Sequence, residues 1–96
     1  MRAMFTCARV FNQDLSKWDV SRVIDMGAMF RNAKNFNQDL SNWDVSRVDD
    51  MGDMFEGANN FKQTLCGGAW VYSDASKDNM FAHSLGSIYS DSVCGA

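Results

Sequence analysis

The sequence contains a tandem duplication of 25 residues, which limits the fold more strongly than any other feature of the chain. Residues 11–35 and residues 36–60 are identical at 19 of 25 aligned positions and differ at six. A repeat of this length is a unit too small to bury its own apolar face, so neighbouring units must stack on one another. We therefore expect a repeat solenoid rather than a domain with one central core.

The repeat extends beyond its two full copies in both directions. Residues 1–10 match the second part of the unit and form a partial repeat, and residues 61–65 keep the phase. The repeat region is thus expected to cover residues 1–65. Residues 66–96 diverge, starting with two extra residues in the segment C-G-G-A-W, and we expect them to form a capping repeat, because solenoids commonly end in an atypical unit.

The apolar residues that are unchanged between the two copies define the expected core. Most of the differing positions exchange polar side chains, and fixed apolar positions among variable polar ones describe an inside and an outside. The main residues expected to be buried are Leu15, Trp18, Val20, Met29, Phe30, Phe36, Leu40, Trp43, Val45, Met54 and Phe55.

Two periodicities inside each unit predict a short strand followed by a short helix. Residues 18–20 and 43–45 alternate apolar and polar, which is typical of a strand, and the apolar residues that follow have helical spacing. Asp25 and Asp50 stand at the start of the predicted helices, where a carboxylate can accept N–H groups of the first turn as an N-cap. The expected fold class is an α/β repeat solenoid with leucine-rich-repeat-like coils, one short parallel strand and one short helix per 25-residue repeat.

The repeat motif FNQDLSxWDVSRVxDMxxMFxxAxxFNQDL resembles that of the BspA-like leucine-rich-repeat surface proteins, in the class with the same repeat length. The likeness is close over residues 1–65 and looser over the cysteine-bearing ending. It implies a right-handed solenoid with surface display, adhesion or binding to other proteins as its function. It implies no catalytic residues and no cofactor.

Three cysteines leave more than one chemistry open. A disulfide between Cys66 and Cys94 would close the cap over the last coil, stabilise the fold by roughly 3–4 kcal/mol and imply an oxidising compartment. The alternative is that both, together with Cys7, are unpaired thiols in a cytosolic or organellar protein. The cysteine spacing and the single histidine, His83, do not match a zinc motif, so we expect no metal site.

Several functional classes are excluded by what the sequence lacks. It has no Ser/His/Asp set and no phosphate-binding glycine loop, and a regular repeat presents the same groups on each coil, so we expect neither an enzyme nor a cofactor. The glycine-rich nonapeptide of calcium-binding β-rolls is also missing, and helix capping accounts for Asp25 and Asp50 without calcium. A net charge of −3 argues against nucleic acid, and no apolar run approaches the ~20 residues of a membrane span.

Two functional hypotheses follow. The first is a protein–protein or cell-surface interaction module of the adhesion type, whose contacts include variable outward positions such as Lys17 and Asn42. The second is a structural accessory subunit, or a fragment packed in a larger assembly. Because the partial repeat lacks a preceding coil, we expect further repeats or another chain to cover the N-terminal edge. No leader peptide is apparent, and we expect an extracellular, cell-surface or secretory location, with an organellar assembly as the alternative.

Overall fold

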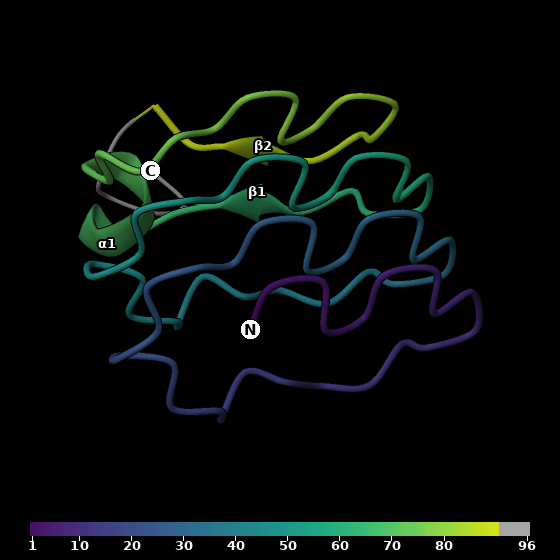
Figure 1. Ribbon diagram of the computed structural model, residues 1–96, viewed down its shortest axis with the longest axis horizontal. Helices are drawn as coiled ribbons and strands as arrows, with labels where there is room; N and C mark the ends of the chain where they lie inside the picture. Colours follow the sequence, from purple (N-terminus) through teal and green to yellow (C-terminus); the bar gives the residue numbers. More distant parts are fainter. Residues whose placement is uncertain (91–96) are drawn as a thin grey trace.

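The computed structural model describes residues 1–90, and its regular secondary structure is sparse. In chain order it contains β1 (Thr64–Leu65), α1 (Gly68–Val71) and β2 (Ser87–Ile88). The two strands form a parallel sheet in which Thr64 pairs with Ser87 and Leu65 pairs with Ile88. The rest of the described backbone forms turns, bends and extended segments, and successive segments lie one above the other from the N-terminus to β2 (Figure 1).

Backbone hydrogen bonds join equivalent positions of successive repeats. Every second N–H group from residue 26 to residue 32 donates to a carbonyl of residues 50–56, at 2.8 to 2.9 Å. The same ladder joins residues 51–57 to residues 76–82. The copies of the repeat therefore lie over one another in register, and each coil satisfies backbone groups of the next.

The segments predicted to be helices are turns, so the helix prediction is wrong in the described residues. Residues 26–33 form two consecutive four-residue turns, each closed by a hydrogen bond from the fourth N–H to the first carbonyl. The third residue of each turn has a positive φ, 55° at Ala28 and 57° at Asn32, as in a type II turn. Consecutive turns place apolar residues at i, i+3, i+4 and i+7, which is also the spacing of a helical stripe.

The predicted strands at residues 18–20 and 43–45 are also absent from the described structure. Outside β1 and β2, the only isolated β-bridges in residues 1–90 are parallel ones that join Asp25 to Asp50 and Asp50 to Ser76. Pairing of repeats thus depends mainly on the turn segments and on side chains rather than on a continuous sheet.

We expect Ala28→Gly to raise the free energy of unfolding by up to about 1 kcal/mol, because alanine at φ 55° bears a steric cost that glycine lacks. Ala33→Gly is the matched control, since Ala33 is fully buried and is not among the residues with positive φ. The Ala33→Gly substitution should lower the free energy of unfolding. Urea unfolding measures this free energy for both variants, and a loss of stability in both would contradict the turn geometry.

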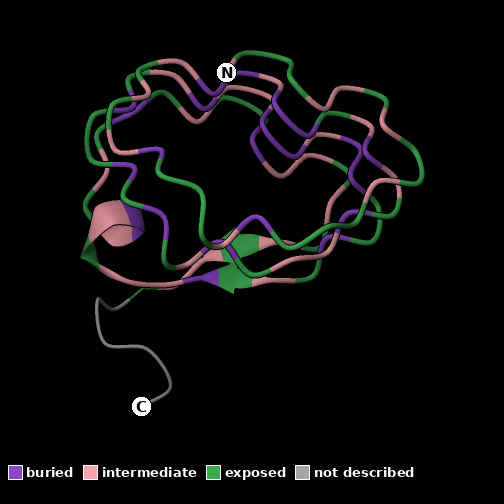
Figure 2. Cartoon of the chain, turned by 90° about the horizontal axis from the view of Figure 1, so that it is seen from below, coloured by how far each residue is buried: buried purple, intermediate pink, exposed green. Residues whose placement is uncertain are grey.

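The core is a single cluster of buried apolar residues. Buried positions recur along the stacked segments of the backbone (Figure 2). The predicted core residues that the cluster buries are Leu15, Val20, Met29, Phe30, Phe36, Leu40, Trp43, Val45, Met54 and Phe55. Trp18 was also expected to be buried, but 38% of its surface is exposed, so the prediction is wrong for this residue. It lies on the first complete repeat, on which no full coil is stacked from the N-terminal side.

Phenylalanines form two stacked columns through the core. Phe5, Phe30, Phe55 and Phe81 make the first, with neighbouring ring centroids 5.5, 5.4 and 5.6 Å apart. The second column joins equivalent rings at positions 11, 36 and 61, with centroids 5.9 and 6.0 Å apart. Rings of the two columns also stack on each other across the boundary between one repeat and the next. Each ring with a neighbour on both sides in its own column therefore touches at least three aromatic rings.

The buried tryptophans carry a hydrogen bond that links repeats. Nε1 of Trp43 donates to the carbonyl of Leu15 at 2.8 Å, and Nε1 of Trp70 donates to the carbonyl of Leu40 at 3.0 Å. Trp70 therefore takes the position of Trp43 in spite of the two-residue insertion. A buried indole N–H that lacked such a partner would destabilise the core.

The motif F-N-Q supplies a second link, on the surface. The Oδ1 atom of Asn12 accepts the backbone N–H of Asn37 at 2.8 Å, and Oδ1 of Asn37 accepts the N–H of Lys62 at 2.9 Å. Because the third copy of the motif has lysine, it offers no amide oxygen to a following coil. This series of side-chain bonds therefore ends at Lys62.

Candidate functional site

The most pronounced break in the repeat lies at α1, and it creates a hollow in the surface. The two extra residues of the C-G-G-A-W segment are accommodated by Gly67, whose φ is 97°, and by the single turn of α1. The hydrogen bonds that close this turn run from Val71 to Gly67 and from Tyr72 to Gly68. Burial of Trp70 anchors the turn to the core, so the other residues of α1 lie against the preceding repeat.

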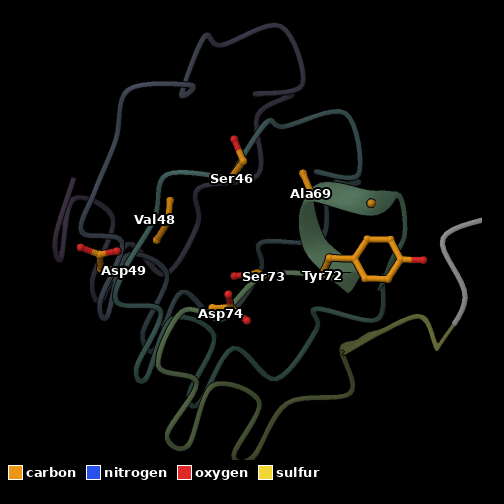
Figure 3. Close-up of a pocket in the computed structure, with 8 residues that line it drawn as sticks. Ser46, Val48, Asp49, Ala69, Tyr72, Ser73 and Asp74 are labelled. Carbon is orange, nitrogen blue, oxygen red and sulfur yellow. The ribbon is translucent and has the colours of Figure 1, made fainter.

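The hollow has a volume of about 300 Å³ and lies between that repeat and the residues after α1 (Figure 3). Its walls are formed by Ser46, Val48, Asp49, Gly68, Ala69, Tyr72, Ser73 and Asp74. The ring of Tyr72 extends away from the segment that carries Ser46 and Asp49, and 72% of the residue is exposed (Figure 3). The site is therefore an open depression with an aromatic ring at its rim.

The groups around the hollow are hydrogen-bonding and acidic. Two carboxylates, those of Asp49 and Asp74, and two serine hydroxyls line it, and no lysine, arginine or histidine does. Such a lining favours ligand groups that donate hydrogen bonds or carry positive charge. Within residues 1–90 no group of three or more His, Cys, Asp or Glu side chains is arranged to hold a metal ion.

A second hollow, of about 370 Å³, lies over the stacked turns. Arg31, Asp53, Glu56, Asn79, Ala82 and His83 line it. Nε of Arg31 donates to Oε1 of Glu56 at 2.8 Å, so the guanidinium is already engaged within the fold. This depression is open and polar, and its paired charges offer less to a ligand than the hollow beside α1.

The predicted caps Asp25 and Asp50 act in turns rather than on helices. Oδ1 of Asp25 accepts the N–H of Gly27 at 2.9 Å, and Oδ1 of Asp50 accepts the N–H of Gly52 at 2.7 Å. Nη1 of Arg2 lies 3.3 Å from a carboxylate oxygen of each aspartate and offsets the repulsion between these stacked charges. A Cβ at Gly27 would overlap this guanidinium, so glycine leaves room for Arg2 there.

The comparisons with known proteins give one match. Residues 1–90 match the family described as Mycoplasma protein of unknown function, DUF285. The chain belongs to this family. No curated protein and no solved structure matches the chain.

For this DUF285 chain the cysteine predictions fall partly outside the described residues. Cys94 lies outside them, so the Cys66–Cys94 disulfide stays a prediction. The N–H of Cys66 donates to Oγ of Ser41 at 3.1 Å, which ties the start of the divergent segment to the preceding repeat. Cys7 is an exposed free thiol.

No helix of the described DUF285 structure is long and apolar enough to cross a membrane. The outward pair from the variable positions, Lys17 and Asn42, is exposed and is not among the residues that line the hollow beside α1. The predicted binding positions are thus not part of the hollow at the most pronounced break in the repeat.

Sequence reasoning missed the hollow and the role of Tyr72. Tyr72 follows Trp70 by two residues, as Val45 follows Trp43. Val45 is buried, whereas Tyr72 is exposed. The available signal was the two-residue insertion before Trp70, since an insertion into a regular coil must bulge outward. The contact of Arg2 with two aspartates was also missed, because Arg2 replaces the glycine found at positions 27 and 52.

Hydrogen bonds from serines lower the pKa of three exposed aspartates. Each accepts from the serine two residues later, in the repeated segments D-L-S and D-V-S. For Asp14 the backbone N–H of Ser16 is the largest cause of the lowered pKa. For Asp19 and Asp44 the hydroxyl of the following serine is the largest cause, and its N–H comes next.

We predict that these three carboxylates contribute to acid sensitivity. Their folded pKa lies below the ordinary value of 3.8, so their stabilising effect is present above pH 3.8. It is lost as the pH falls from 3.8 through the lowered folded values. Replacing all three by asparagine keeps an oxygen acceptor for the serine N–H and should flatten the fall of stability over that window. Equal slopes in thermal melts of variant and wild type at stepped pH would contradict this.

Proposed function

We propose that the chain is a non-catalytic interaction module of the BspA-like leucine-rich-repeat type. Its fold class would be a right-handed repeat solenoid, displayed at a cell surface or in a secretory compartment, with protein partners. Register-matched hydrogen bonds between repeats support the stacked-coil fold, although turns stand where a helix was expected in each coil. The repeat motif supports the family resemblance.

The observation that carries the proposal is the hollow beside α1 with Tyr72 at its rim. A regular repeat offers the same groups on every coil, so a specific partner is best recognised where the regularity is broken. Exposed tyrosines contribute a large share of binding energy at protein interfaces, since they bring apolar area and a hydroxyl together. The carboxylates of Asp49 and Asp74 select for a basic or hydrogen-bond-donating partner surface.

The same lining supports a role without catalysis. No histidine lines the hollow, and Nζ of Lys77, the lysine beside Ser73, donates to the carbonyls of Ser73 and Ala75 at 2.6 and 3.1 Å. Neither group is therefore placed as a base for the serine hydroxyls. A lining with two carboxylates and no basic group also disfavours phosphate, and with it nucleic acid. We propose no cofactor.

The experiment is a binding series with variants of the hollow. The chain is immobilised and exposed to solubilised cell-surface proteins, and the retained protein is purified and titrated against each variant. Tyr72→Ala should weaken binding by tenfold or more, which corresponds to about 1.4 kcal/mol. Asp74→Ala should weaken it by a smaller factor.

Asn42→Lys is the matched control, because it copies Lys17 of the preceding repeat, and Asn42 is exposed and does not line the hollow. It should bind as the wild type does. Wild-type affinity for Tyr72→Ala would remove the hollow from the proposal, and a loss with Asn42→Lys would move the contact to the repeat surface. If no protein is retained above the level of an unrelated globular control, the interaction role fails.

One observation favours the second function, that of a structural accessory subunit or a fragment packed in a larger assembly. Met4 is 53% exposed, although its equivalents Met29 and Met54 are fully buried. Trp18 is exposed on the same side. An uncovered apolar end of this kind is typical of a surface that other residues complete.

A further inference from the structure

The N-terminal face is the surface formed by the carbonyls of Arg2, Met4 and Thr6 and by the side chains of Met4, Phe5, Phe11 and Trp18. We infer that this face is a docking surface for one further coil of the same 25-residue repeat, joined in phase to residue 1. The inference concerns a different surface from the hollow beside α1, so either can fail without the other.

Unused hydrogen-bond acceptors are the first argument. In the next coil, the carbonyls of Gly27, Met29 and Arg31 accept N–H groups of residues 3, 5 and 7. In the coil after that, residues 52, 54 and 56 accept in the same way. The equivalent carbonyls of the N-terminal face accept no hydrogen bond within residues 1–90, so the ladder stops with its acceptors pointing outward.

Two side chains of the N-terminal face, those of Phe5 and Trp18, also lack partners that their equivalents in the next repeats have. The ring of Phe30 is stacked between those of Phe5 and Phe55, whereas Phe5 has a ring of its own column on one side only. Trp43 and Trp70 each donate to a leucine carbonyl of the preceding repeat, but Nε1 of Trp18 has no hydrogen-bond partner in the described chain. A coil with phenylalanine and leucine at the repeat positions would supply both missing contacts.

A third missing contact involves the asparagine series. The N–H of Asn37 is bound by Oδ1 of Asn12, and the N–H of Lys62 is bound by Oδ1 of Asn37. The N–H of Asn12 has no hydrogen bond in the described structure. An asparagine one repeat earlier would accept it. The face is thus continuous with an interface that already joins the coils.

The position of the amino group fixes how the added coil is joined. Met1 N donates to the carbonyl of Asp25 at 3.1 Å, just as the peptide N–H of Met26 donates to Asp50 at 2.9 Å. The amino group therefore occupies the place of a peptide N–H in the ladder. A coil attached there by a peptide bond keeps this bond and enters in register.

A second copy of the chain fits the face less well. Its last coil has Phe81 for the first aromatic column, but the sequence has no phenylalanine after Phe81 and no asparagine after Asn79. Phe11 and Asn12 would therefore stay without their partners. A head-to-head copy fits worse, since outward carbonyls would meet outward carbonyls.

The test extends the full chain at residue 1. One fusion carries a copy of residues 26–50 directly before Met1, which is in phase because residue 51 is the equivalent of residue 1. The control fusion carries residues 36–50 followed by residues 26–35, with the same composition and length but out of phase. Both are compared with the original chain by thermal melting and by peroxide oxidation of Met4.

The in-phase fusion should melt several degrees higher than the original chain and the control, because it completes one interface between neighbouring coils. Sulfoxide formation at Met4, followed by mass spectrometry of the tryptic peptide of residues 3–9, should slow severalfold in that fusion alone. Equal melting temperatures of the two fusions, or unchanged oxidation of Met4 in the in-phase fusion, would overturn the inference. So would concentration-dependent self-association of the original chain that protects Met4, since the occupant would then be a second copy.

Discussion

Replacing Trp43 by alanine is expected to lower the free energy of unfolding by about 3–5 kcal/mol. The side chain is 1% exposed, and its removal leaves a large cavity between two coils. It also removes the indole N–H that binds the carbonyl of Leu15, which then keeps only the backbone N–H of Trp18 as a partner, at 3.0 Å. Urea unfolding followed by circular dichroism measures the loss.

Trp18→Ala is the matched comparison for this change. It removes the same side chain from the equivalent position of the preceding repeat, where the residue is 38% exposed and its Nε1 forms no hydrogen bond in the described structure. The loss should be clearly smaller than for Trp43→Ala. Equal losses would contradict the open N-terminal face, and a silent Trp43→Ala would contradict the stacked core.

Phe55→Ala is expected to cost a similar amount, about 3–5 kcal/mol. The Phe55 ring is fully buried and stacks on three others, with centroids 5.4 Å from Phe30, 4.0 Å from Phe61 and 5.6 Å from Phe81. Its loss interrupts one aromatic column and unstacks its neighbour in the other. Each such aromatic pair contributes about 0.5–1.5 kcal/mol beyond the area it buries.

Phe55→Leu separates the two effects, because leucine keeps most of the apolar volume and removes the ring. It should destabilise less than alanine does, and the loss of stability that remains with leucine reports on the packing of the rings. Guanidinium unfolding of both variants provides the two values. If leucine were as damaging as alanine, filling the core would matter little and ring stacking would dominate.

Lys17→Asn offers a check on the outer surface. Lys17 is exposed, and the next repeat has asparagine at the equivalent position, Asn42. A change confined to the outside of a coil should alter stability by less than about 0.5 kcal/mol.

The sequence by itself determined which residues are buried in the middle of the molecule. Residues unchanged between the two copies, such as Leu40 and Val45, are buried, because a duplicated unit must pack against its own copy. The same reasoning failed for Trp18, because repeat phase describes a residue in the interior of a stack and not one at its end. Only the tertiary structure shows which coil has a neighbour.

Local conformation was decided by the contacts between coils. The spacing of Met26, Met29, Phe30 and Ala33 fits both a helix and two consecutive turns, and the sequence favoured the helix. Among residues 26–33 of the structure, four N–H groups bond to the next coil, three close turns, and that of Gly27 binds Oδ1 of Asp25. A helix with internal bonds could not pair with the next coil in this way. The hollow beside α1 likewise depends on where the insertion before Trp70 bulges, and that direction is set by the core that Trp70 joins.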